Sequence, residues 1–574
     1  RWSPSHASAK LRSRGGVCQA LWNMRRFVLA AIMFEAFDIA TIDVLTAFLY
    51  STVECPQVAP TSEGTCPVGS FLAADTCEPE PPQSHHWSMS ALCADKHEVM
   101  LKTTHLKGYL HDLQHGAALL AALVAGPLID TVGRKPMLLT ALGFQVVYCL
   151  MLFLACVVGQ QMKALYVTFV GLAFVCAGCS LSIFHPTSAA MVADLSGDCT
   201  ATRGDGYAAL SVVVNISVFV GYGSAFPLLK AHLENYLPVW AAAVGIGAAA
   251  MLASGLVLKE TMPDAAAPSP SNRPQRAATV VSVQSSDTDG TGPSSKTGRS
   301  VARSIPRTVS HVSYKAARET VNGFQCVWRD RFLLHFVILF GFVTVASVSI
   351  LHLLNAYQVS VLGYDNATAS LCGIVLPVVG IISSVLTSVF IRKCGVYGLL
   401  VVQFLVVVVG FLAAGALAAN PHWAPAGFWF GLALFAIGWS SVQACSRTII
   451  SMHVPTDRQG SVFAILQVVS GLLSMTVGLL WPEVFFHPGA KGWRTGAIWI
   501  ASGAVVFFCT IWFAFLMIAC PSPADSADAA FCGVNVSQNE VSREASISSE
   551  TTTDSGSDSG SSDEVVHEDS QARV

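Results

Sequence analysis

The chain has 574 residues, of which 53% are hydrophobic and only 12% are charged, and its formal net charge is −3. Soluble proteins carry charged residues at roughly a quarter of their positions. A chain of this length with half that share of charged residues has too few of them to cover a water-exposed surface. This composition excludes a soluble multidomain protein, a disordered chain and a nucleic-acid binder, and it leaves a polytopic membrane protein.

Twelve apolar segments can cross a bilayer, because a hydrocarbon core of about 30 Å needs about 20 apolar residues in helical conformation. The first six cover Phe27–Tyr50, Gly108–Leu128, Met137–Val158, Leu165–Ala190, Tyr207–Leu229 and Leu237–Leu258. The second six cover Phe332–Leu354, Ala369–Ile391, Gly398–Ala419, Phe428–Cys445, Ser461–Phe485 and Gly496–Ile518. Pro186 predicts a kink or an early end in the fourth. Since the alternation of a membrane β-barrel is missing, we predict an all-α polytopic membrane protein with twelve transmembrane helices in two six-helix halves.

The segments outside these spans divide the chain further. The predicted parts are a basic cytoplasmic N-terminus (1–26), a six-helix bundle (27–258) with an outer loop (51–107), a disordered linker (259–331), a second bundle (332–518) and an acidic, Ser-rich tail (519–574). Lys and Arg are more frequent on the side of the membrane that holds the N-terminus, and such an excess is typical of cytoplasmic loops. We therefore expect both termini and the linker in the cytoplasm.

The outer loop carries four cysteines, Cys55, Cys66, Cys77 and Cys93. In an oxidising compartment this even number would form two disulfides, with three possible pairings. The alternative is free thiols facing the lumen of an intracellular organelle. Paired cysteines would suit the plasma membrane or a secretory or endolysosomal membrane, and we expect one of these locations.

The turn between the second and third spans carries the most specific motif, which reads GPLIDTVGRKPML from position 126 to 138. Gly126 allows close helix approach, Asp130 can cap a helix N-terminus, and Gly133 permits a tight turn. Arg134 and Lys135 are expected to hold the loop at the inner membrane interface. The segment resembles the G-x-L-x-D-x-x-G-R-K-x-x-L signature of the major facilitator superfamily at every position.

This resemblance implies the major facilitator fold, with a solute site between the halves near the bilayer midplane and transport by alternating access. In the family, the carboxylate at the position of Asp130 meets the start of the eleventh helix in the outward-facing state. Pro455–Gly460 and the pattern Asp38-Ile-Ala-Thr41 are similar to the drug-proton antiporter branch, which includes tetracycline exporters. The fifth span lacks the Gly-Pro pair of that branch, and the fourth span lacks its arginine.

Ionisable groups within a span are costly, so they are candidates for function. The first span holds Glu35, Asp38 and Asp43, and at about 1.5 Å per residue Asp38 lies near the midplane, with Glu35 on the same face. Either carboxylate could carry a coupled proton or bind a cationic solute. The alternative is a structural hydrogen bond to a neighbouring helix, which we favour for Asp43.

Other polar side chains lie where they could face a central cavity. They are His111, Asp112, His115, His185, Asn215, His352, Asn355 and Gln443. Histidine titrates near neutral pH and can carry protons, although a histidine within the membrane can also be a helix–helix contact. Arg447, near the inner end of the tenth span, is expected to anchor that end at the interface.

These features together predict a secondary transporter for a small organic solute, coupled to protons, that acts as a monomer in the bilayer. A facilitative uniporter, or a receptor or scaffold on a transporter fold, remains the alternative. We expect no enzymatic activity, because no catalytic constellation is apparent, and no cofactor or nucleic-acid partner. His111 and His115 have the i, i+4 spacing of metal ligands, but the sequence offers no third ligand. A phosphate-binding glycine loop is missing from the sequence, so we do not expect direct use of ATP.

Overall fold

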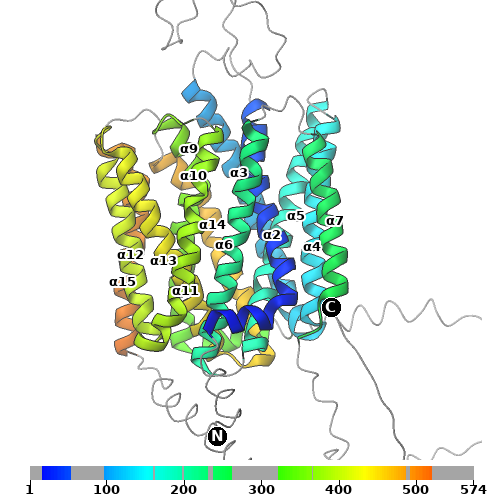
Figure 1. The fold of residues 1–574 in the computed structure, drawn as a ribbon, viewed down its shortest axis with the longest axis vertical. Coiled ribbons are helices and arrows are strands. Elements are labelled where there is room, and N and C mark those ends of the chain that lie inside the picture. Colours follow the sequence, from blue (N-terminus) through cyan, green and yellow to red (C-terminus); the bar gives the residue numbers. More distant parts are fainter. Residues whose placement is uncertain are drawn as a thin grey trace, which may run out of the picture. The chain divides into compact units, whose positions relative to one another are not determined.

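The computed structural model describes residues 16–52, 96–158, 162–196, 199–230, 237–261, 318, 321–364, 366–485 and 492–519 (Figure 1). Some side chains within these ranges, including those of 37–52, lie outside the description. The chain forms two units, Arg1–Cys520 and Pro521–Val574. The second unit, the outer-loop cysteines and most of the predicted linker lie outside the described residues, so the predictions made for them stay predictions.

The first unit is built of long helices (Figure 1). Those of the first half are α2 (Gly16–Thr52), α3 (Lys96–Thr131), α4 (Arg134–Val158), α5 (Lys163–Ser196), α6 (Thr200–Lys230) and α7 (Leu237–Val257). Those of the second half are α9 (Arg331–Ser360), α10 (Asn366–Gly373), α11 (Val375–Cys394), α12 (Val396–Leu417), α13 (Ala424–His453), α14 (Gln459–Phe485) and α15 (Ala497–Ala519). Short 3₁₀ turns, η3 (Thr456–Arg458) and η4 (Gly492–Gly496), precede α14 and α15.

Among the residues that the structure describes, nine helices are long and apolar enough to cross a membrane. A tenth is added if Val321–Arg329 and Arg331–Ser347, which meet at a bend of 103°, are one span. Helices α2 and α14 occupy the positions of the predicted first and eleventh spans but are not among these. The all-α prediction is confirmed, with no strand in the described ranges, while the number of twelve spans stays a prediction.

Pro186 does not end its helix. Helix α5 continues through it to Ser196, so the alternative of an early end is wrong. Neighbouring helices and polar side chains can satisfy the backbone group that a proline frees in a membrane helix. The predicted span ended at Ala190, so it is six residues too short at this end.

Two glycines with positive φ make the sharp turns that follow α3 and α11. Gly133 has φ +117° between α3 and α4, and Gly395 has φ +73° between α11 and α12. Residues with a side chain rarely adopt such angles, so glycine is favoured at both turns. The second turn follows Arg392 and Lys393, which resemble the Arg134-Lys135 pair of the first, so the two halves have corresponding turns.

The two halves pack against each other through long helix pairs. Helix α3 lies against α14, and α6 lies against α11 and α13. Gly126 permits the first of these contacts, because a Cβ atom there would lie 2.7 Å from Cβ of Ala464 and 3.0 Å from Cα of Ser461. Within the first half, the rings of Phe34 and Phe184 stack with centroids 3.7 Å apart, which holds α2 against α5.

Candidate functional site

A cavity of about 400 Å³ lies between the two halves of the helical unit. It is lined from α2, α3, α5 and α6 of the first half and from α9, α11, α13 and α14 of the second. This volume is within the range of small-molecule sites, which are mostly apolar with a few convergent polar groups. The predicted candidates that line it are Glu35, His111, His185, Asn215 and Gln443.

Three predicted candidates cannot be placed in the same way. The side chains of Asp38, His352 and Asn355 lie outside the described residues, although their helices α2 and α9 are described. Their proposed roles remain predictions. His115, which the sequence placed beside His111, does line the cavity.

Glu35 and His185 form the acid–imidazole pair of the cavity. Nδ1 of His185 lies 3.8 Å from Oε1 of Glu35, and the Glu35 side chain is buried. This distance allows an ion pair when the imidazole is protonated. The pair joins α2 to α5 within the first half, so a proton added here changes the charge on one side of the cavity.

His111 belongs to a second polar group, on α3. Its Nδ1 lies 3.0 Å from Oε1 of Gln114. An amide oxygen only accepts hydrogen bonds, so this contact requires the proton on Nδ1. The rings of His111 and His115 are 6.5 Å apart, one helical turn along the same face. Across the described residues, no group of three or more His, Cys, Asp or Glu side chains could hold a metal ion.

Asn215 spans the interface between the halves at the edge of the cavity. Its amide nitrogen donates to the carbonyl of Ser211 at 2.8 Å on its own helix α6. The same nitrogen donates to Oγ of Ser440 at 3.3 Å, on α13, and to Oγ of Ser384 at 3.5 Å, on α11. Asn215 therefore both lines the cavity and joins the halves in this conformation.

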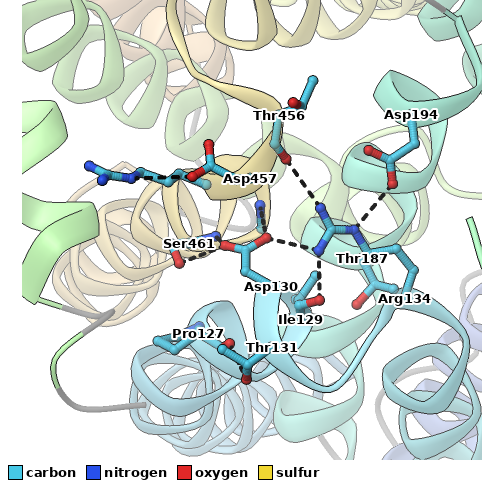
Figure 2. Close-up of polar contacts among 12 residues, drawn as sticks. Pro127, Ile129, Asp130, Thr131, Arg134, Thr187, Asp194, Thr456, Asp457 and Ser461 are labelled. Carbon is cyan, nitrogen blue, oxygen red and sulfur yellow. Dashed lines mark hydrogen bonds and ion pairs between the residues drawn. The ribbon is translucent and has the colours of Figure 1, made fainter. Parts of the chain in front are cut away.

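The motif between α3 and α4 joins the halves at the other interface (Figure 2). The carboxylate of Asp130 accepts hydrogen bonds from the backbone N–H groups of Gly460, at 3.0 Å, and Ser461, at 2.8 Å. Oγ of Ser461 donates to it as well, at 2.7 Å. These donors belong to the first turn of α14, whose unpaired N–H groups and dipole favour an anion.

Arg134 lies at the centre of the same cluster (Figure 2) and is 1% exposed. Its guanidinium donates to the Ile129 carbonyl at 2.6 Å, to Asp130 Oδ1 at 2.9 Å and to Asp194 Oδ2 at 3.2 Å. It also donates to the Thr456 carbonyl, at 3.4 Å, in the second half. The expectation that Arg134 faces the membrane interface is wrong, because two buried carboxylates compensate its charge inside the protein.

Glu260, just past α7, completes the motif in a way the sequence did not indicate. Its carboxylate accepts hydrogen bonds from the backbone N–H groups of Arg134, at 2.9 Å, and Lys135, at 3.1 Å. It therefore caps the N-terminus of α4. A Cβ at Gly133 would lie 2.6 Å from Glu260 Oε2, so a side chain there would displace this carboxylate in addition to straining φ.

A second set of contacts between the halves lies at the start of α6. Asp205 forms an ion pair with Arg392 and accepts a hydrogen bond from Ser388, both on α11. The Arg203 guanidinium donates to the backbone carbonyl of Ser451, on α13. No spacing rule in the sequence links Arg203 or Arg392 to these partners, which lie almost 200 positions or more away.

Arg447 is placed differently from its sequence-based expectation. It lines the cavity from α13 and does not anchor the helix end at the interface. Position 447 shares a helical face with Phe435, Trp439 and Gln443, at successive intervals of four residues, and all of these line the cavity.

The sequence model of the Major Facilitator Superfamily matches residues 113–479. The chain belongs to the major facilitator superfamily. It is therefore an integral, multi-pass membrane protein of a family of solute transporters. The match runs from within α3 to within α14, and so includes the α3–α4 motif, both interfaces between the halves and most of the cavity.

Solved structures of transporters share the fold of this facilitator. The human organic anion transporter MFSD10 (TETRAN) has a TM-score of 0.56 at 14% identity, over 85% of this chain and 98% of its own. The proton:xylose symporter XylE has a TM-score of 0.55 at 12% identity, over 86% of this chain and 94% of its own. A bacterial homologue of the iron transporter ferroportin has a TM-score of 0.54 at 11% identity, over 86% of this chain and 98% of its own. No curated protein sequence matches the chain.

Proposed function

We propose that this facilitator is a secondary transporter that moves a small organic solute by alternating access, coupled to protons. The cavity between the halves carries this proposal, because it brings the Glu35–His185 pair together with His111 and Gln443 at one site. A solute there would be in contact with both halves, and rocking of the halves would expose it to either side of the membrane.

The conformation described fits one stage of such a cycle. The contacts of Asp130 with α14 and of Asp205 with α11 join the halves where the α3–α4 and α11–α12 turns lie. If this end is cytoplasmic, as the excess of basic residues favours, the protein is closed toward the cytoplasm. Breaking these contacts would then be part of opening the cavity inward.

The Glu35–His185 pair is the strongest candidate for proton coupling among the described side chains. Its two groups are within 4 Å, belong to different helices, and face the cavity. Uptake of one proton changes their summed charge, which changes what the site attracts. Asp38 lies on α2, three residues further along the chain, and we propose that it takes part in the same proton pathway.

Membership of the drug-proton antiporter branch is a narrower hypothesis. Pro455–Gly460 supports it, and this segment does contact Asp130 through Gly460. Helix α6 lacks the Gly-Pro pair of that branch, and α5 contains no arginine. We therefore propose proton coupling without assigning the direction of solute movement relative to the proton.

Proteoliposomes with an imposed pH gradient test the proposal. Uptake from a solute library should follow the gradient in the unaltered protein and should lose that dependence in Glu35→Gln and His185→Gln, with protein incorporation unchanged. His422→Gln, an exposed histidine between α12 and α13, is the matched control and should behave as the unaltered protein. Uptake that ignores the gradient would indicate a uniporter. Absence of solute flux in the unaltered protein would favour a non-transporting receptor or scaffold, and flux that survives deletion of both the linker and the tail would exclude one.

A further inference from the structure

The cavity contains one permanent cation among its described lining residues, the guanidinium of Arg447. Arg447 lies six residues before the end of α13, so it is about 9 Å inside the helix end. Holding a charge at such a depth is costly unless a partner compensates it. Buried arginines are therefore expected to be paired, as Arg134 is with its two carboxylates.

Arg447 has no such partner within the described part of the chain. No hydrogen bond or ion pair connects its guanidinium to another described side chain or carbonyl. Glu35 exerts an electrostatic attraction on it, and the same carboxylate lies 3.8 Å from Nδ1 of His185. The guanidinium of Arg447, with its five N–H donors, therefore lines the cavity without a hydrogen-bond acceptor among the described residues.

We propose that the transported solute is an organic anion whose carboxylate binds Arg447, with an apolar body extending along α13. This rests on the proposed transport function and names its substrate class. A guanidinium matches a carboxylate with two parallel hydrogen bonds, which gives orientation as well as affinity.

The apolar part of the site lies on the same helix. Trp439 is eight residues before Arg447, or about 12 Å along the axis, and its ring stacks on that of Phe435 with centroids 6.0 Å apart. Phe340, from α9, adds a third ring to the cavity wall. A solute with its carboxylate at Arg447 and a hydrophobic or aromatic body near these rings would be about 12 Å long. A sugar, with many hydroxyls and no charge, fits this lining poorly.

The charges of the lining favour an anion over a cation. Arg447 and Glu35 cancel each other formally, and the remaining titratable side chains that face the cavity, from α3, α5 and α6, are His111, His115, His185 and Tyr222. A cationic solute would need Glu35, which already has His185 beside it. An anionic solute would need Arg447, whose guanidinium has no hydrogen-bond acceptor among the described residues.

Three probes of one shape and different charge test the proposal, namely phenylbutyrate, phenylbutanamide and phenylbutylamine. Binding to the full-length protein in detergent is measured by thermal shift and calorimetry, without transport. The anion should bind about tenfold or more tightly than the amide. Arg447→Gln should remove this advantage and leave amide binding unchanged, and Arg447→Glu should transfer the preference to the amine.

Arg494→Gln, at an exposed arginine in η4, is the matched control and should change nothing. Arg447→Lys keeps the charge but loses the paired hydrogen bonds, so it should weaken anion binding by less than Arg447→Gln does. Equal binding of the three probes, a preference of the unaltered protein for the amine, or anion binding that survives Arg447→Gln would overturn the proposal. The comparison of probes measures binding to the unaltered protein and requires no transport. A negative result there can therefore be distinguished from a failure of proton-coupled transport in proteoliposomes.

Discussion

Asp130 of α3 accepts a hydrogen bond from the backbone N–H of Ser461 at 2.8 Å, across the interface between the two halves and 331 positions along the chain. The Ser461 hydroxyl donates to the same carboxylate oxygen, at 2.7 Å. A single side chain of the first half therefore caps a helix of the second. This contact joins the halves at this end, and in the proposed alternating-access cycle it would stabilise the conformation described relative to one open at this end.

Asp130→Asn should shift the protein away from the conformation described. The amide keeps one acceptor oxygen but loses the charge that pairs with Arg134 and with the α14 terminus, and hydrogen bonds to charged groups contribute about 1.5–3 kcal/mol. We expect the population closed at this end to fall by about tenfold or more, with solute affinity nearly unchanged. Distances between spin labels on α3 and α14 would measure the shift.

The control for this variant is Asp457→Asn, which removes an exposed carboxylate three residues before Gly460. Its ion pair with Arg458, at 3.9 Å, is exposed and should contribute little. If Asp130→Asn lowered solute affinity in proportion to turnover, the contact would belong to the binding site and not to the conformational change.

Arg134→Lys should destabilise the protein almost as strongly as Arg134→Ala. The guanidinium donates to Ile129, Asp130 and Asp194 at once, and an ammonium cannot span these acceptors from one point. Leaving two buried carboxylates without their shared partner costs about 3 kcal/mol or more. Thermal unfolding of the purified protein should show both variants well below Lys135→Ala. A lysine variant with unaltered stability would mean that charge alone suffices here.

Gly126→Ala should open the α3–α14 interface. A Cβ at this position would lie 2.7 Å from Cβ of Ala464, so one helix must move away from the other. Gly245→Ala, on α7, is the matched control, because nothing lies within 4 Å of a Cβ there. Alanine is the better helix former by about 1 kcal/mol, so the control should be neutral or more stable. Cross-linking of cysteines placed on α3 and α14 would detect the separation.

Asp205 and Arg392 should be energetically coupled across the second interface between the halves. A double-mutant cycle of Asp205→Asn and Arg392→Gln should give a coupling energy of about 0.5–3 kcal/mol, since the pair is partly buried and Ser388 shares the carboxylate. The same cycle on Asp457 and Arg458, which are exposed, should give a value near zero. Equal coupling in the two cycles would show that burial adds nothing at Asp205.

Much of the site could be anticipated because its signals are local. A polar residue in an apolar run stands out in the sequence, and Glu35, His111, His185, Asn215 and Gln443 all line the cavity. Arg447 stood out equally but was assigned to the membrane interface, because its position near a helix end fits that role. Which way a side chain points depends on how the helix is rotated against its neighbours, and spacing along one helix does not contain that rotation.

The amino-acid sequence alone determined the all-helical membrane architecture and the family, because bilayer thickness requires long apolar runs and the α3–α4 motif occupies consecutive positions. Tertiary structure decided which charges are paired. Asp130 meets Ser461, Asp205 meets Arg392 and Glu35 meets His185, all between residues at least 150 positions apart. Such pairs form only when packed helices bring them within a few ångströms, and electrostatic attraction depends on that distance and on burial, neither of which chain order specifies.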